Sequence, residues 1–142
     1  MTADEIIDIL QLEAHPEGGF YHETWRHNAG SERSAGTAIY FLLKAGQASR
    51  WHRVDSTEIW HHYAGDPLEL VISATGKDTE RHVLGTDLAA GQRPQRIVPP
   101  YAWQSASTLG EWTLVGCTVS PGFDFDGFEM APPEWQPGIS PR

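Results

Sequence analysis

Turn-forming residues divide this chain into short segments. Fourteen glycines and 10 prolines are spread over its 142 residues. The segments between them have the length and composition of β-strands, and residues 37–43 are the most apolar of these. Many short strands with turn signals between them predict a mainly β protein, either a sandwich or a barrel. The predicted strands cover residues 20–26, 37–43, 49–54, 58–63, 68–73, 79–84, 95–98, 103–106 and 112–119.

The two ends of the chain differ from this pattern. Residues 2–13 predict one short N-terminal helix, because Thr2 and Glu5 have the spacing of a capping box and apolar residues recur behind them at helical intervals. Residues 132–142 contain four prolines and predict an extended C-terminal arm, ordered or partly disordered. The length suits one domain over residues 1–142.

Composition excludes two classes of partner. The net charge is −9, from 19 acidic and 10 basic residues, and the sequence has no basic cluster that would displace counterions from nucleic-acid phosphates. No segment approaches the ~20 apolar residues of a membrane span, and the N-terminus lacks the pattern of a signal peptide. We therefore expect a cytoplasmic protein that binds neither nucleic acid nor membrane. The lone cysteine, Cys117, lies in an apolar run and is predicted to be buried and unreactive.

The segment from Gly46 to Gly65 contains the most informative spacing. His52 and Val54 are two residues apart on a predicted strand, so their side chains point to the same side. A turn at residues 55–56 then folds the chain back, which can bring Glu58 up beside them on the next strand. In a small barrel this side is the interior, so His52 and Glu58 are the candidate catalytic residues.

This spacing resembles the first motif of the cupins, G-x5-H-x-H-x3-E-x6-G, with Val54 in the place of the second histidine. The second cupin motif, P-x-G-x2-H, is matched more loosely at residues 99–104, where Tyr101 replaces the glycine and Gln104 replaces the histidine. Longer segments resemble the cupin-5 group of small single-domain cupins, a domain of unknown function. These segments are residues 15–21, 51–53, 58–60, 98–99, 103–104 and 116–123.

The resemblance implies an antiparallel jelly-roll β-barrel with a pocket open at one end, commonly paired into homodimers. It also raises the question of a metal, because metal-binding cupins hold Fe, Mn, Ni or Zn with three histidines and a glutamate. Only His52 and Glu58 remain as strong metal ligands here, with a weak carbonyl oxygen from Gln104. His62 supplies a further imidazole if it faces inward with Glu58; otherwise it is a half-exposed strand residue. A divalent metal and a metal-free site both stay open.

Without a metal, His52 and Glu58 form either a proton-transferring pair, as in the epimerases that share the cupin barrel, or a buried polar pair without catalysis. Aromatic residues are expected to line the pocket, as most small-molecule sites are largely apolar. The candidates for the pocket wall beside Gln104 are Trp103, Tyr40, Trp60 and the histidine His62.

The function predicted first is a cupin that binds a small molecule and acts on a sugar or small acid as an isomerase or epimerase. The alternatives are a non-catalytic module that captures or senses a metabolite, and a metal-dependent enzyme such as an oxygenase. Arg26 and Arg53 are either a clamp for a carboxylate or phosphate of the ligand, or partners of nearby acidic side chains.

Overall fold

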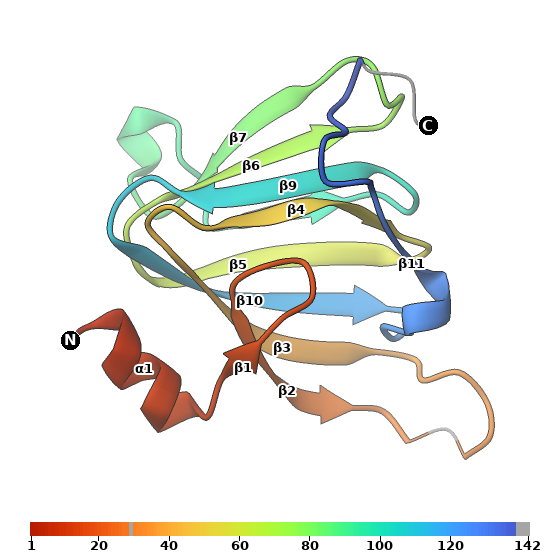
Figure 1. Cartoon of the computed structure of the whole chain (residues 1–142). Coiled ribbons are helices and arrows are strands. Elements are labelled where there is room, and N and C mark those ends of the chain that lie inside the picture. Colours follow the sequence, from red (N-terminus) through yellow and green to blue (C-terminus); the bar gives the residue numbers. More distant parts are fainter. Residues whose placement is uncertain (29, 139–142) are drawn as a thin grey trace.

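Two antiparallel sheets lie face to face (Figure 1) in the computed structural model, which describes residues 1–28 and 30–138. Within these residues, the first sheet contains, in spatial order, β1 (Glu13–Ala14), β2 (Phe20–Arg26), β3 (Thr37–Lys44), β10 (Trp112–Ser120), β5 (Thr57–Gly65) and β8 (Gln95–Val98). The second contains β11 (Phe128–Met130), β4 (Ala48–Val54), β9 (Trp103–Thr108), β6 (Leu68–Ser73) and β7 (Glu80–Leu84). This is the predicted mainly β, jelly-roll architecture.

The nine predicted strands are all present, with ends that agree to within two residues. Strands β1 and β11 were not predicted, because two or three residues are too short to show a period-two pattern. Two short 3-10 turns, Leu88–Ala90 and Phe125–Gly127, complete the elements of the described chain. None of its helices combines the length and the apolar character needed to cross a membrane.

The hydrophobic core lies between the sheets, where alternate side chains of each strand point inward. Phe41, Trp60 and Val115 come from the first sheet, and Leu70 and Ala106 from the second; all five are at most 2% exposed. Each of these strands therefore buries one face, and the register between strands decides which residues reach the interior.

The N-terminal helix α1 spans Ala3–Leu10, shorter than the predicted 2–13. The Thr2 and Glu5 capping box is formed as expected. The helix ends early because Gln11 adopts a left-handed conformation (φ 56°), which turns Leu12 back to be buried with Ile6 on the outer face of the first sheet. Residues 13 and 14 then join the sheet as β1 rather than extending the helix.

The loop over residues 15–19 brings a carboxylate between the two sheets. Its ends are closed by a hydrogen bond from the His15 backbone N–H to the Gly19 carbonyl oxygen (2.9 Å), and the Arg50 N–H of β4 donates to the Glu17 carbonyl oxygen (2.7 Å). Gly18 has φ 109°, and a Cβ there would collide with the carbonyl oxygen of Ala48. Only glycine allows so close an approach in this conformation, so the loop is held against β4.

The segment after β11 is not a loose arm. Trp135 is 6% exposed and packs against Trp51 and Trp103 on the outer face of the second sheet, with ring centroids 6.0 and 4.7 Å away. The Gly138 N–H also donates to the Gly76 carbonyl oxygen (2.8 Å). Burial of a large indole therefore fixes this segment to the sheet. The rest of the predicted arm, residues 139–142, lies outside the described chain.

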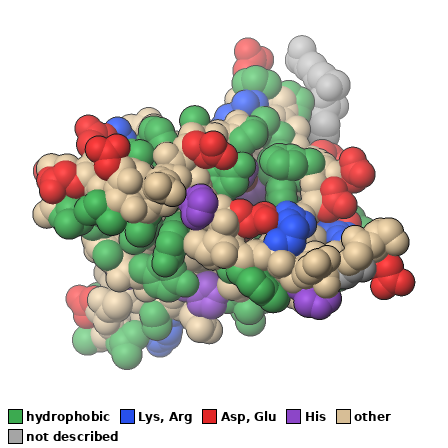
Figure 2. Space-filling view, turned by 90° about the horizontal axis from the view of Figure 1, so that it is seen from below, with side chains coloured by type: hydrophobic (Ala, Val, Ile, Leu, Met, Phe, Trp, Pro, Cys, Tyr) green, Lys and Arg blue, Asp and Glu red, His purple; other side chains and the backbone are tan. Residues whose placement is uncertain are grey.

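The surface agrees with the acidic composition. On the face seen in Figure 2, acidic side chains occur in several separate places, and the basic side chains are fewer.

The first prediction concerns the Trp135 contact. Replacing Trp135 by Ala removes a buried indole and should lower the free energy of unfolding by about 3 kcal/mol, as measured by urea denaturation. The matched control is Trp25→Ala, because the Trp25 side chain is 54% exposed and its loss should cost little. Equal stability of the two variants would show that the C-terminal segment does not contribute to the fold.

Candidate functional site

A cavity of about 70 Å³ lies between the sheets and opens at one end. Its buried end is formed by ionisable groups and its walls by Ile39, Val54 and Val119. The exposed end is bordered by β2 and by the segment that follows β10. The ionisable lining residues are His15, Glu17, Tyr21, Glu23, Arg26, His52, Glu58 and Cys117, and the aromatic ones at the opening are Phe123 and Phe125.

His52 lies on β4 and forms a buried ion pair with Glu17. The distance from His52 Nε2 to Glu17 Oε2 is 3.0 Å, and both side chains are less than 8% exposed. The other ring nitrogen, Nδ1, lies 2.6 Å from the Arg50 carbonyl oxygen. A carbonyl oxygen and a carboxylate can only accept, so both ring nitrogens donate and the side chain is an imidazolium.

The pKa values of this pair follow from two opposed effects. Burial alone lowers the pKa of His52, but the Glu17 carboxylate and its hydrogen bond outweigh burial and raise the pKa to about 9. Burial likewise acts to raise the pKa of Glu17, and the attraction of His52 reverses this, so that its pKa is lowered. Both groups are therefore charged at neutral pH.

Glu58, on β5, has a different environment. Its Oε1 accepts a hydrogen bond from Gln104 Nε2 (2.8 Å), and Gln104 Oε1 accepts one from Trp60 Nε1 (2.8 Å). Burial raises the pKa of Glu58 to about 7; His52 opposes this shift and the Glu17 carboxylate adds to it. Glu58 therefore exchanges its proton near neutral pH, unlike its two charged neighbours.

The other ionisable groups at the buried end stay neutral. Burial, together with the nearby Glu58 carboxylate, raises the pKa of Cys117 well above its ordinary value, so the side chain remains a thiol. His15 Nδ1 accepts a hydrogen bond from the Glu17 backbone N–H (3.1 Å), and burial lowers the pKa of this histidine. Among the described residues that form the buried end, His52 is then the one cation.

The structure brings together some of the residues predicted for the site. His52 and Glu58 line the same cavity, and Gln104 lies directly behind Glu58 through a hydrogen bond. Trp60 is 1% exposed and reaches the site only through Gln104, so it supports Glu58 rather than forming part of the wall.

Three of the predicted wall residues lie elsewhere. Trp103 is on the outer face of the second sheet, where the Arg53 guanidinium lies 4.6 Å above its ring. Tyr40 is on the outer face of the first sheet, in the apolar cluster beneath α1. His62 faces the interior but farther along β5, and its Nε2 lies 3.1 Å from the Asp66 carbonyl oxygen. Arg53 is paired with Glu129 (3.1 Å), so it is not a clamp at the cavity.

The main residue that sequence reasoning missed is Glu17. It was considered only as part of a segment that resembles the cupin-5 group, without a role in the site. The signal was an acidic residue between Pro16 and the pair Gly18 and Gly19, which is a composition typical of a tight loop. Such a signal predicts a turn, but it does not indicate that the turn enters the barrel.

The donor set does not fit a transition metal. Both nitrogens of His52 are engaged by protein acceptors, Val54 offers no ligand atom, and the amide of Gln104 is shared between Glu58 and Trp60. Within residues 1–28 and 30–138, no three histidine, cysteine, aspartate or glutamate side chains are placed to hold a metal ion together. We therefore derive no chemistry from a metal at this site.

Comparison with known protein families agrees with the fold described above. Residues 4–131 match the family described as Cupin superfamily (DUF985), the domain of unknown function known as Cupin_5. The chain belongs to this family. No curated protein matches it.

Solved structures give the same fold. A crystal structure of a Shewanella oneidensis protein is 40% identical, with a TM-score of 0.87 over 92% of this chain and 84% of the other. A hypothetical protein from Leishmania major is 36% identical, with a TM-score of 0.82 over 91% and 86%. Oxalate decarboxylase from Bacillus subtilis is 13% identical with a TM-score of 0.65, over 82% of this chain but 29% of that one, so it shows the fold alone.

The second prediction tests the ion pair. In the Glu17→Gln variant, burial is no longer balanced by a carboxylate, so the pKa of His52 should fall by about 1–3 units from its value near 9. Titration of the imidazole by NMR measures this shift. Glu129→Gln is the matched control, since it removes a carboxylate that pairs with Arg53 outside the cavity. An unchanged His52 titration in the Glu17 variant would contradict the assignment.

The third prediction concerns stability against pH. The folded state favours the neutral form of Glu58. The stability that this group contributes is therefore lost as pH rises from its ordinary pKa of 4.5 through about 7. The folded state favours the charged form of His52, so the stability from this group is lost as pH rises from 6.5 through about 9. The folded state also favours the charged form of Glu17, and the stability from that group is lost as pH falls below 4.5. The contributions of Glu58 and His52 to the free energy of unfolding should therefore decline from about pH 5 to pH 9, while the lowered pKa of His15 acts in the opposite direction up to about pH 6.5.

The matched variant for this decline is Glu58→Gln, which keeps an oxygen to accept from Gln104 but does not ionise. Urea denaturation at several pH values should show that it abolishes the part of the decline below about pH 7 and leaves the part near pH 9. A Glu58→Gln protein with the full wild-type pH dependence would contradict the raised pKa.

Proposed function

We propose that this cupin binds a compact polar molecule in the cavity and catalyses a proton shift on it, as an isomerase. One observation carries the proposal: Glu17, His52 and Glu58 meet at the buried end of an accessible cavity, in surroundings that separate their pKa values. Neighbouring ionisable groups whose environments separate their pKa values in this way are typical of acid–base catalysis.

The charges suggest a role for each group. Glu58, with a pKa near 7, is the general base: it removes a proton from a carbon next to a carbonyl group and returns that proton to a neighbouring atom of the ligand. His52 cannot serve as the base, because it already carries both protons and its pKa is about 9. Its imidazolium instead stabilises, through its charge alone, the negative charge that develops on the carbonyl oxygen, because both of its N–H groups already donate to Glu17 and the Arg50 carbonyl oxygen.

This assignment makes Glu58, and not the histidine, the base of the proton-transferring pair. With one base, the proton leaves and returns on the same face of the ligand, which is the geometry of an isomerising shift. Inversion at a carbon would need a second group that exchanges its proton near neutral pH on the opposite face. Cys117 does not meet this need, since burial holds its pKa well above the ordinary value.

A second candidate function is capture of a metabolite without turnover. It is favoured by the hydrogen bonds that already hold the buried groups: Glu58 to Gln104, and His52 to Glu17 and the Arg50 carbonyl oxygen. A fully satisfied polar network can serve as a rigid binding surface. The two candidates differ in whether a proton of the ligand exchanges with solvent.

The fourth prediction separates them. Compact hydroxy acids, keto acids and short sugars incubated with the protein in D₂O should include compounds that lose a C–H signal by NMR. Glu58→Gln should slow that exchange by about 10²–10⁴-fold while the compound still binds. Glu69→Gln is the matched control, because Glu69 pairs with Arg81 outside the cavity. Binding without exchange by the wild type would favour capture, and equal exchange by Glu58→Gln would exclude Glu58 as the base.

A further inference from the structure

A row of paired residues crosses the first sheet at the cavity. In the strand register, Arg26 pairs with Thr37, Thr37 with Val119, and Val119 with Glu58. Directly paired residues point to the same face of a sheet, and all four line the cavity. Three steps of about 4.8 Å separate the Cα atoms of Arg26 and Glu58 by about 14 Å along the sheet. Their side chains extend into the cavity from opposite ends of this row.

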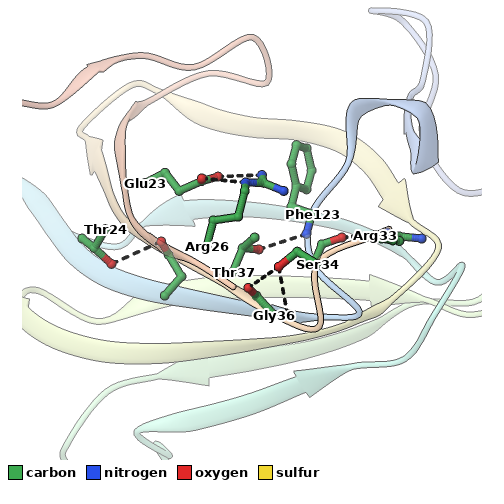
Figure 3. A network of polar contacts seen from close by, with 10 residues as sticks. Glu23, Thr24, Arg26, Arg33, Ser34, Gly36, Thr37 and Phe123 are labelled. Atoms are coloured by element: carbon green, nitrogen blue, oxygen red, sulfur yellow. Dashed lines mark hydrogen bonds and ion pairs between the residues drawn. The ribbon is translucent and has the colours of Figure 1, made fainter. Parts of the chain in front are cut away.

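Arg26 has hydrogen-bonding capacity to spare. Its Nε and Nη2 donate to the two carboxylate oxygens of Glu23, each at 2.8 Å. A guanidinium has five N–H groups, so three remain, including both on Nη1, and no other acceptor for them occurs among the described residues. Figure 3 shows Phe123 beside the guanidinium on the side away from Glu23. The free edge of the fork has the geometry that binds a carboxylate through two parallel hydrogen bonds.

The other arginines near this end of the barrel are already occupied. Arg33 makes a two-bond pair with Asp55 and also donates to the Gly122 carbonyl oxygen. Arg53 lies on the outer face with Glu129. Of the described residues that line the cavity, Arg26 is the one arginine, and it lies at the open end where a ligand enters.

The cavity volume limits the ligand. A volume of about 70 Å³ favours a compact ligand, such as a three-carbon hydroxy acid, over a large one. Ile39, Val54 and Val119 make the middle of the cavity apolar, as a short hydrocarbon segment between two polar ends requires.

We propose that Arg26 binds the carboxylate of a compact monocarboxylic acid whose other end reaches Glu58 and His52. This inference rests on the proposed function and names its substrate class. Glu23 already balances the charge of Arg26, so a single carboxylate gains hydrogen bonds. A second negative charge on the ligand would meet only His52, whose charge Glu17 already balances. Glu23 acts as a positioning residue, because its two hydrogen bonds hold the guanidinium in place.

The test uses lactate and its neutral amide, lactamide, as probes of the same size. Ligand-observed NMR titration of the full chain should show wild-type protein binding lactate at least tenfold more tightly than lactamide, since charge-assisted hydrogen bonds are worth about 10- to 100-fold. Arg26→Gln should lose this preference, because it weakens lactate binding much more than lactamide binding. Arg26→Lys keeps the charge without the fork and should retain part of the preference. Arg53→Gln is the matched control, and the melting temperature of each variant verifies its fold.

The inference would be overturned by equal binding of lactate and lactamide by the wild type, or by an Arg26→Gln variant that keeps the preference for lactate. Failure of both probes to bind in the millimolar range would also overturn the substrate class. These results are distinct from failure of the proposed function, which is judged by the Glu58-dependent exchange of ligand protons. If a neutral compound exchanges its protons but the lactate test fails, the proposed carboxylate site is wrong and the proposed isomerase function still stands.

Discussion

The site depends on the ion pair between Glu17 and His52. Two charges taken out of water cost more than their attraction returns unless each is also well hydrogen-bonded. Here His52 meets that condition through the Arg50 carbonyl oxygen, and Glu17 is held in place because its own backbone carbonyl accepts from the Arg50 N–H. The close contact at Gly18 allows this approach. The ion pair therefore attaches the loop after β1 to β4, and a change at the glycine would alter the charge of the histidine.

The same ion pair determines the pKa of Glu58. A third charge in this volume would have to be stabilised by an imidazolium that already has a carboxylate partner. Burial and Glu17 therefore prevail over the attraction of His52, and the pKa of Glu58 rises to about 7. Gln104 and Trp60 fix the carboxyl group without supplying a charge. Because His52 is already paired with Glu17, it only partly stabilises a charge on Glu58, and the pKa of this buried carboxyl group therefore lies near 7.

Much of this arrangement could be predicted from the sequence, because strand alternation and turn positions place His52 and Glu58 on one side of adjacent strands. The errors have identifiable causes. Trp103 and Gln104 were both expected in the pocket, but consecutive strand residues face opposite ways. Tyr40 lies in a run that is apolar on both faces, so its side could not be assigned. His62 does share the face of Glu58, but four residues along a strand is about 13 Å. Glu17 depends on a tertiary contact that local patterns do not encode.

Glu17 explains what replaces the second histidine of the cupin motif, whose position is occupied by Val54. In the cupin pattern the residue at this position adds a second imidazole beside the first; here the wall is apolar, and a carboxylate from a distant loop takes the Nε2 of His52. Such a carboxylate fixes a proton on the imidazole, which turns the histidine from an electron-pair donor into a permanent cation. The barrel then holds its positive charge on a protonated side chain of fixed position, whose two N–H groups donate to Glu17 and to the Arg50 carbonyl oxygen. The proposed proton shift rests on this fixed charge, which would lie near the carbonyl oxygen of the ligand while the neighbouring carboxyl group moves a proton.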